Sequence, residues 1–128
     1  MGDRNDAQGA VSNSSIYVLT VLLIGSTLSY IDRQVISLVV QPIKAAFALS
    51  DTQVGLLQGI AFSLCYAIAG LPLALAVDRT NRVRLASACV AVWSMATSAC
   101  GVVSSYLGLL LARATTAVSE AGFSPAAL

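Results

Sequence analysis

Long apolar stretches, each about the length of a membrane-crossing helix, divide this chain into four parts. A helix needs about 20 apolar residues to cross a hydrocarbon core roughly 30 Å thick. The stretches that meet this requirement cover residues 16–40, 54–77, 85–103 and 106–128. The second and third contain no charged residue. The pattern predicts an all-α, multi-pass bundle of four transmembrane helices that occupies residues 16–128.

Polar segments flank these stretches and predict where helices begin and end. Residues 1–15 are rich in Gly, Ser, Asn and Asp, which is typical of a disordered, water-exposed tail. The first connector contains Pro42, which ends or redirects a helix. It then places Ser50 three residues before Gln53, the spacing of a capping box. A new helix is therefore expected to start near residue 51.

Basic residues in the connectors predict the orientation. Residues 78–84 hold three arginines, the connector at 41–53 holds one lysine, and the turn at 104–106 holds none. Short loops rich in Arg and Lys stay in the cytoplasm, so the arginine-rich loop is expected there. This places both termini in the cytoplasm. We expect a multi-pass protein of the cell membrane, in a bacterium the inner membrane.

Composition agrees with a membrane environment. Hydrophobic residues make up 57% of the chain and charged residues 10%, whereas soluble domains are about 25% charged. No basic run with interleaved aromatic residues exists, which argues against nucleic acid as a partner. Three cysteines lie in apolar runs and are interpreted as packing residues. Gly55 and Gly59 form a GxxxG pair, which predicts a close helix contact.

Ionisable residues interrupt the first and last stretches: Asp32, Arg33, Arg113 and Glu120. Each costs at least about 2.5–3.5 kcal/mol at the bilayer centre, so a functional interpretation is the default. At 1.5 Å per residue, Asp32 and Arg113 lie at similar depths, roughly 10–12 Å from the outer side, and Glu120 lies deeper. On this count Asp32 neutralises Arg113. Burial disfavours the charged form of Glu120, which makes it a candidate proton carrier. The alternative is a pair of salt bridges that fix the helix register.

Enzymatic chemistry has little support in the sequence. The chain contains no histidine, which excludes His-based metal sites and Ser-His-Asp catalysis. It has no phosphate-binding GxxxxGK[ST] loop. Asp32 is the one aspartate within a stretch, and no Gly-x-Gly-Asp surrounds it as in an intramembrane aspartyl protease. We predict no enzymatic activity, no cofactor and no metal.

The loop between the second and third stretches carries a recognisable motif. Residues 74–82 resemble G-x-L-A-D-R-x-G-R, the signature of the major facilitator superfamily of transporters. The agreement is at Asp78, Arg79 and Arg82. The sequence departs from the signature at Ala74, Ala76 and Asn81. In that family this element is a cytoplasmic latch. The alternative is positive-inside anchoring alone.

Two further elements resemble the spinster-like branch of this superfamily. The first stretch contains the string Tyr-Ile-Asp-Arg at residues 30–33, and the fourth contains an Arg followed by small residues and Glu at residues 113–120. The phrase SDTQVGLLQGIAFSLCYAIAGLPL also resembles that branch. The resemblance covers residues 17–128 and implies a proton-linked carrier that works by alternating access. It implies that Asp32 and Glu120 are proton carriers. Arg33 would bind an anionic head group, and Arg113 would orient the carboxylates.

The sequence thus leaves two functions open. The first is a proton-coupled secondary transporter of a small organic or amphipathic anionic solute, with lysolipids as one substrate class. Its partners would be membrane lipid, the small-molecule substrate, protons and the remaining helices. Superfamily members have twelve helices and bind substrate between two halves, so we expect no transport by these four helices alone. The second is a small four-helix membrane scaffold or regulatory protein, which needs no further helices.

Overall fold

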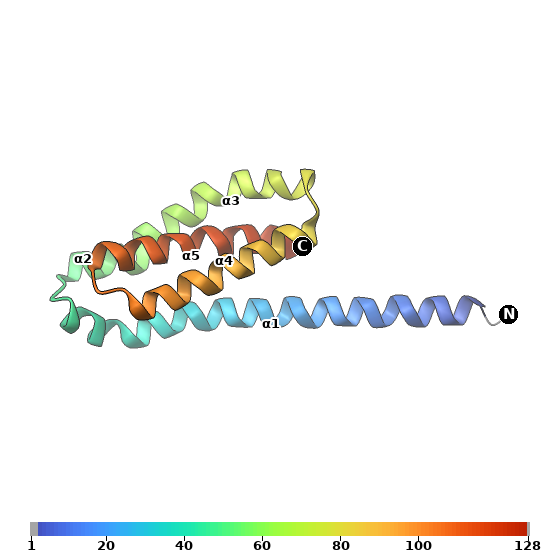
Figure 1. The fold of residues 1–128 in the computed structure, drawn as a ribbon, viewed down its shortest axis with the longest axis horizontal. Coiled ribbons are helices and arrows are strands. Elements are labelled where there is room, and N and C mark those ends of the chain that lie inside the picture. The colour runs from blue at the N-terminus through green and yellow to red at the C-terminus, as the bar shows by residue number, and fades with distance from the viewer. Residues whose placement is uncertain (1–2, 128) are drawn as a thin grey trace. The chain divides into compact units, whose positions relative to one another are not determined.

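The computed structural model describes the backbone of residues 3–127 and the side chains of residues 14–126. Its elements are α1 (Asp3–Ala46), α2 (Asp51–Gly55), the π-helical turn η1 (Leu56–Ile60), α3 (Ala61–Arg79), α4 (Arg82–Val102) and α5 (Tyr106–Ala127) (Figure 1). α2, η1 and α3 follow one another without a break and form one long helix. The described residues therefore contain four long helical segments. The predicted all-α, four-helix architecture is confirmed.

The chain divides into two compact units, Met1–Val35 and Ile36–Leu128. The first contains most of α1, and the second contains the end of α1 and every later helix. The structure differs from the tail predicted for residues 1–15, because the backbone is helical from Asp3 onward. Met1 and Gly2, also part of the predicted tail, lie outside the described residues.

Within the described residues, three helical segments are long and apolar enough to cross a membrane: Ser14–Ala46, Asp51–Arg79 and Arg82–Val102. The fourth predicted span, α5, does not meet that criterion of length and composition. One broad side of α5 is buried in the second unit, including two charged residues and two hydroxyl residues. The helix can therefore be less apolar than its neighbours, because protein rather than lipid covers those groups.

The second unit is built around α5. This helix packs along both α3 and α4, which contact each other little (Figure 1). From its start to residue 123, its exposed side chains form one narrow stripe at helical spacing, made of Leu107, Leu111, Thr115 and Val118. Nearly all its other side chains from residue 109 to 123 are buried. The core of the unit consists of α5 and the facing sides of its neighbours.

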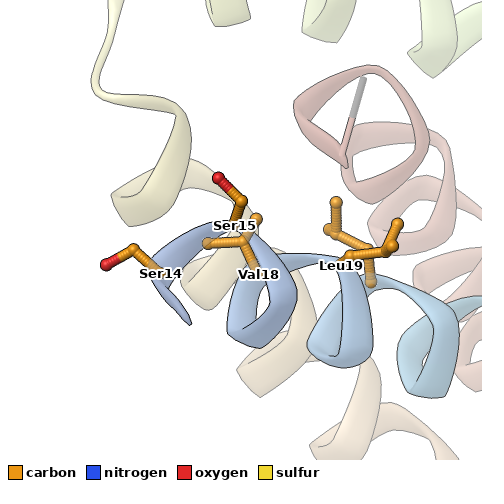
Figure 2. A pocket seen from close by; sticks show the side chains of 5 residues that line it. Ser14, Ser15, Val18 and Leu19 are labelled. Carbon is orange, nitrogen blue, oxygen red and sulfur yellow. The ribbon is translucent and has the colours of Figure 1, made fainter. Parts of the chain in front are cut away.

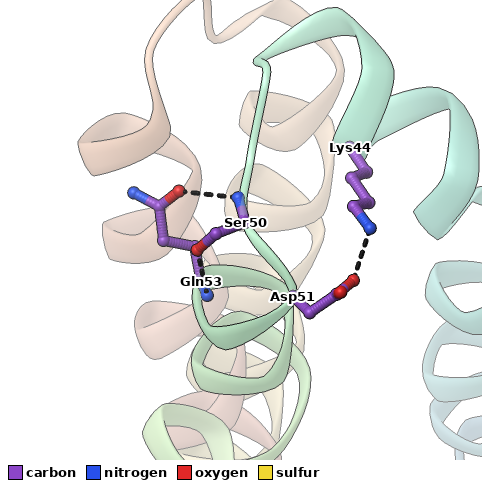
Figure 3. Close-up of polar contacts among 4 residues, drawn as sticks. All are labelled: Lys44, Ser50, Asp51 and Gln53. Carbon is purple, nitrogen blue, oxygen red and sulfur yellow. Dashed lines mark hydrogen bonds and ion pairs between the residues drawn. The ribbon is translucent and has the colours of Figure 1, made fainter.

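The connector before α2 is closed by polar contacts at both of its ends (Figure 3). The Ser50 hydroxyl accepts a bond from the Gln53 N–H at 3.2 Å, and the Ser50 N–H donates to Gln53 Oε1 at 3.0 Å. This confirms the predicted capping box. Lys44 and Asp51 form an ion pair across the connector. The chain reversal here is set by local sequence.

Of the two outcomes predicted for Pro42, an end or a redirection of the helix, the structure does not show an end. α1 continues through this proline to Ala46, since proline removes one backbone donor and still permits the helical turn that follows it. The helix ends where Ala48 adopts a left-handed conformation with φ of 50°. The Leu49 N–H then donates to the Lys44 carbonyl at 3.0 Å, a bond typical of helix C-termini. Leu49 itself is buried and holds the turn against the unit.

Candidate functional site

The four ionisable residues predicted inside the membrane fall in different units. Asp32 is half-buried and Arg33 is exposed, and both belong to the first unit. Arg113 and Glu120 belong to α5 in the second unit and are 4% and 3% exposed. The expected neutralisation of Arg113 by Asp32 would join the two units, so it stays a prediction. Of these four residues, the second unit therefore contains the two on α5.

Arg113 and Glu120 lie on one side of α5. They are seven residues apart, which is nearly two helical turns or about 10 Å along the axis. Thr116 lies between them and is completely buried. Its hydroxyl donates to the Ala112 carbonyl at 3.0 Å, so its polar group is satisfied within its own helix. The side of α5 that faces protein therefore presents a cation and a carboxyl with small residues between them.

An aromatic ring on α3 contacts the arginine. The Arg113 Cζ atom lies 5.0 Å from the centroid of the Phe62 ring, within the range of a cation–π interaction. Phe62 in turn stacks on Tyr66, with ring centroids 6.3 Å apart and planes inclined by 22°. Sequence reasoning did not identify Phe62 as a site residue, because nothing in the apolar stretch around it distinguishes it from a packing residue.

The predicted latch residues meet at the turn between α3 and α4. Asp78 and Arg79 end α3, Arg82 begins α4, and all three are exposed. Asn81 stands where the superfamily signature has glycine. Its Oδ1 accepts bonds from the Val83 and Arg84 N–H groups at 3.0 and 3.4 Å. This departure from the signature therefore supplies the N-cap of α4.

The predicted GxxxG pair makes no close helix contact in the described residues. A methyl group added to Gly55 or Gly59 would meet nothing within 4 Å. At Gly122 it would lie 2.6 Å from Cys89 Sγ and 3.2 Å from Leu73 Cδ1. Gly122 therefore marks a point where α5 lies close against both α3 and α4, two residues beyond the buried carboxyl. Cys89 is a free, buried thiol, as expected of a packing residue.

An open hollow lies beside the first described turns of α1 (Figure 2). Its lining comes from that helix alone: Ser14, Ser15, Val18, Leu19 and Leu22. Two hydroxyl groups among aliphatic side chains supply no charge or metal ligand. None of the predicted site residues lines it.

Known proteins resemble this chain over most of its length. Residues 22–128 match the family model of the Major Facilitator Superfamily. The chain is 37% identical over 107 residues to an MFS-type efflux pump of Mycolicibacterium smegmatis, a match that covers 84% of this chain and 25% of the pump. The chain therefore spans about a quarter of the length of this relative.

Two crystal structures of a bacterial homologue of the human lysosomal transporter Spinster also match. The inward-facing, unoccupied form gives a TM-score of 0.82 at 50% identity and covers 87% of this chain and 23% of that chain. The inward-facing, occupied form gives a TM-score of 0.81 at 48% identity, with coverages of 89% and 24%. At these identities the likeness extends to sequence as well as fold.

Proposed function

Because this chain belongs to the major facilitator superfamily, we propose that it forms the first four helices of a proton-coupled transporter for an anionic, amphipathic solute. Membrane transport is the activity of the relatives it matches. The observation that carries the finer proposal is the pair Arg113 and Glu120, both almost fully buried on α5. Ionisable residues inside a membrane are costly, and they mark substrate or proton pathways.

Glu120 is the principal proton carrier in this proposal. Ionisable groups inside a membrane mark proton pathways, and in this proposal Glu120 gives up its proton when water reaches it and takes one up when the site closes. A proton bound in one state of the transporter and not in the other shifts the balance between the states. Asp32 is the second proton carrier, Arg33 binds the anionic head group of the solute, and Arg113 orients the carboxylates.

Further helices complete the transport pathway in this proposal. Secondary transporters bind their substrate between two repeats, and this chain spans about a quarter of the matched relatives. The partners are therefore membrane lipid, protons, the solute and the helices that supply the remaining walls.

A split-transporter assay tests the proposal. The purified chain is placed in liposomes alone, or together with the part of the bacterial Spinster homologue that it does not match. The probe is a fluorescent lysophosphatidic acid under an imposed pH gradient. We expect uptake only when both parts are present. Glu120→Gln should abolish gradient-driven uptake while exchange at equal pH persists. Thr115→Ser, on the exposed stripe of the same helix, is the matched control.

Other outcomes of this assay overturn defined parts of the proposal. Uptake by the chain alone would show that no further helices are needed. If Asp32→Asn removes the pH dependence and Glu120→Gln keeps it, the roles of the two carboxyls are reversed. If the paired parts assemble but move no lysolipid or proton, the scaffold function is favoured. Asp32→Asn is also expected to lower the amount of protein in the membrane, because it leaves Arg113 with less compensation.

We also propose that both termini are cytoplasmic in a bacterial inner membrane. The arginine-rich turn between α3 and α4 supports this orientation. Thr80, at the centre of that turn, is exposed. Once Cys65, Cys89 and Cys100 are replaced, a cysteine at position 80 should react with an impermeant thiol reagent only after the cells are opened. Equal labelling of intact cells would mean that the orientation is inverted.

A further inference from the structure

The π-helical turn η1 determines which way the Phe62 ring points. In an α-helix, residues five apart differ in direction by about 140°, at 3.6 residues per turn. In a π-turn the hydrogen bond joins residues five apart, so such residues lie nearly above one another. Here the Ala61 N–H donates to the Leu56 carbonyl, five residues earlier. The next pair in the same register is Leu57 and Phe62, which are only 1% and 8% exposed.

The π-turn sets the direction of Phe62 relative to Leu57. At regular α-helical spacing the two side chains would point about 140° apart, whereas the extra residue of η1 turns them toward the same side. The turn is tied on its other side by Gln58, whose amide donates to the Ile36 carbonyl at 3.3 Å. π-turns of this kind occur frequently at functional sites. In this chain the turn directs an aromatic ring toward the buried arginine of α5.

We propose that Phe62 is a positioning residue that holds the Arg113 guanidinium by a cation–π contact, so that the arginine keeps its place when Glu120, on the same side of α5, changes protonation state. The contact distance of 5.0 Å carries this inference. The attraction comes from the negative face of the ring, and it is stronger when both groups are desolvated. Arg113 and Phe62 are both buried.

The Phe62 ring differs from a carboxylate partner because its attraction for the guanidinium does not depend on protonation. A carboxylate attracts a guanidinium only while it is ionised, whereas the ring neither gains nor loses a proton over the working range of pH. The hold of Phe62 on Arg113 is therefore independent of pH. In the transport role, this inference rests on the proposed function, because Phe62 keeps a fixed positive charge on the same side of α5 as Glu120, which alternates between charged and neutral forms.

Chemical modification of Arg113 in the purified 128-residue chain tests the inference directly. Phenylglyoxal reacts with guanidinium groups that water reaches, and peptide mass spectrometry reports each arginine separately. We expect Phe62→Leu to raise the rate at Arg113 about tenfold relative to exposed Arg84, which corresponds to a contact of about 1.4 kcal/mol. Phe62→Trp should restore the slow rate. Phe123→Leu is the matched control, because Phe123 is also 8% exposed.

A series of fluorinated phenylalanines at position 62 separates cation–π attraction from packing. Fluorine withdraws charge from the ring face and leaves its shape nearly unchanged, so the rate at Arg113 should rise with each added fluorine. The same series at position 123 should have no effect. This arm stands even if Phe62→Leu does not fold.

The pH dependence supplies a second signature. In the unaltered chain, the ratio of the Arg113 rate to the Arg84 rate should stay constant across the range in which the carboxyls titrate. In the Phe62→Leu variant, the ratio of the Arg113 rate to the Arg84 rate should rise as the carboxyls take up protons. Equal effects of Phe62→Leu and Phe123→Leu, or no trend with fluorine number, would overturn the inference. No substrate is present in these measurements, so their failure is distinct from failure of the proposed transport.

Discussion

Helices α4 and α5 pack against each other, yet they differ in how much of their surface is buried and in whether the buried side contains charges. α4 buries one narrow stripe at helical spacing, made of Cys89, Trp93 and Ala96, and exposes apolar side chains elsewhere. α5 exposes the narrow stripe and buries most of the rest, charges included. α4 is apolar enough to span a membrane by composition, and α5 is not.

The comparison indicates that the position of a helix in the bundle determines whether it can contain charged and polar side chains. A helix with lipid on several sides must be apolar on those sides, since a charge there costs several kcal/mol. A helix covered by its neighbours is free of that requirement and holds polar groups where other side chains meet them. The charged residues of α5 therefore lie on its covered side, and its exposed stripe is made of Leu, Val and Thr.

The largest expected effect concerns the narrow stripe of α4. Trp93 is 7% exposed, whereas Met95, two residues further along, is 66% exposed. Trp93→Ala should destabilise the chain by about 3–5 kcal/mol, because it leaves a cavity in the packed stripe. Met95→Ala should change the stability little. Unfolding of the purified chain in mixed detergent micelles measures both. Similar losses in the two variants would mean that α4 has no distinct buried side.

Much of this arrangement follows from the sequence. The capping box at Ser50 and Gln53 places the start of the second long helix, and the structure confirms it. The superfamily, identified from motifs, is confirmed by the matched family model and relatives. The seven-residue spacing of Arg113 and Glu120 places both on one side of α5, and both are buried. Local bonds and helical periodicity suffice for these features.

Other features depend on contacts that no local pattern reveals. The GxxxG pair at Gly55 and Gly59 predicts a close contact, but tight packing occurs at Gly122. Which glycine meets a neighbour depends on how three helices come together. Phe62 was missed because nothing in its apolar stretch distinguishes it from a packing residue, and the sequence carries no signal for the extra residue of the π-turn. The predicted pairing of Asp32 and Arg113 stays a prediction.

A second test concerns the exposed stripe of α5. Val118 lies on this stripe, two residues from buried Glu120. If the stripe meets lipid, Val118→Asp should raise the free energy of membrane insertion by about 2.5–3.5 kcal/mol. Val118→Leu is the control and should insert normally. The fraction of chain recovered in the membrane measures the effect. Normal insertion of the aspartate variant would show that protein or water covers this stripe.

The smallest expected effect lies where α5 meets α4. A methyl group on Gly122 would lie 2.6 Å from Cys89 Sγ, which is too close for either atom to keep its place. Gly122→Ala should therefore destabilise the chain by about 1–3 kcal/mol. Gly101→Ala on α4 is the matched control, since its methyl would meet nothing within 4 Å. It should stabilise the chain by about 0.5–1 kcal/mol through helix propensity.

Removing the thiol sharpens this last prediction. In the double variant Gly122→Ala with Cys89→Ala, the sulfur that the new methyl would meet is absent. The loss should then be smaller than the sum of the two single losses, because residues in contact are not additive. The added methyl would still lie 3.2 Å from Leu73 Cδ1. This contact should cost little stability, because the end of a leucine side chain can shift without moving its helix. Additive losses in micelle unfolding would place the close approach of α5 on α3 rather than on α4.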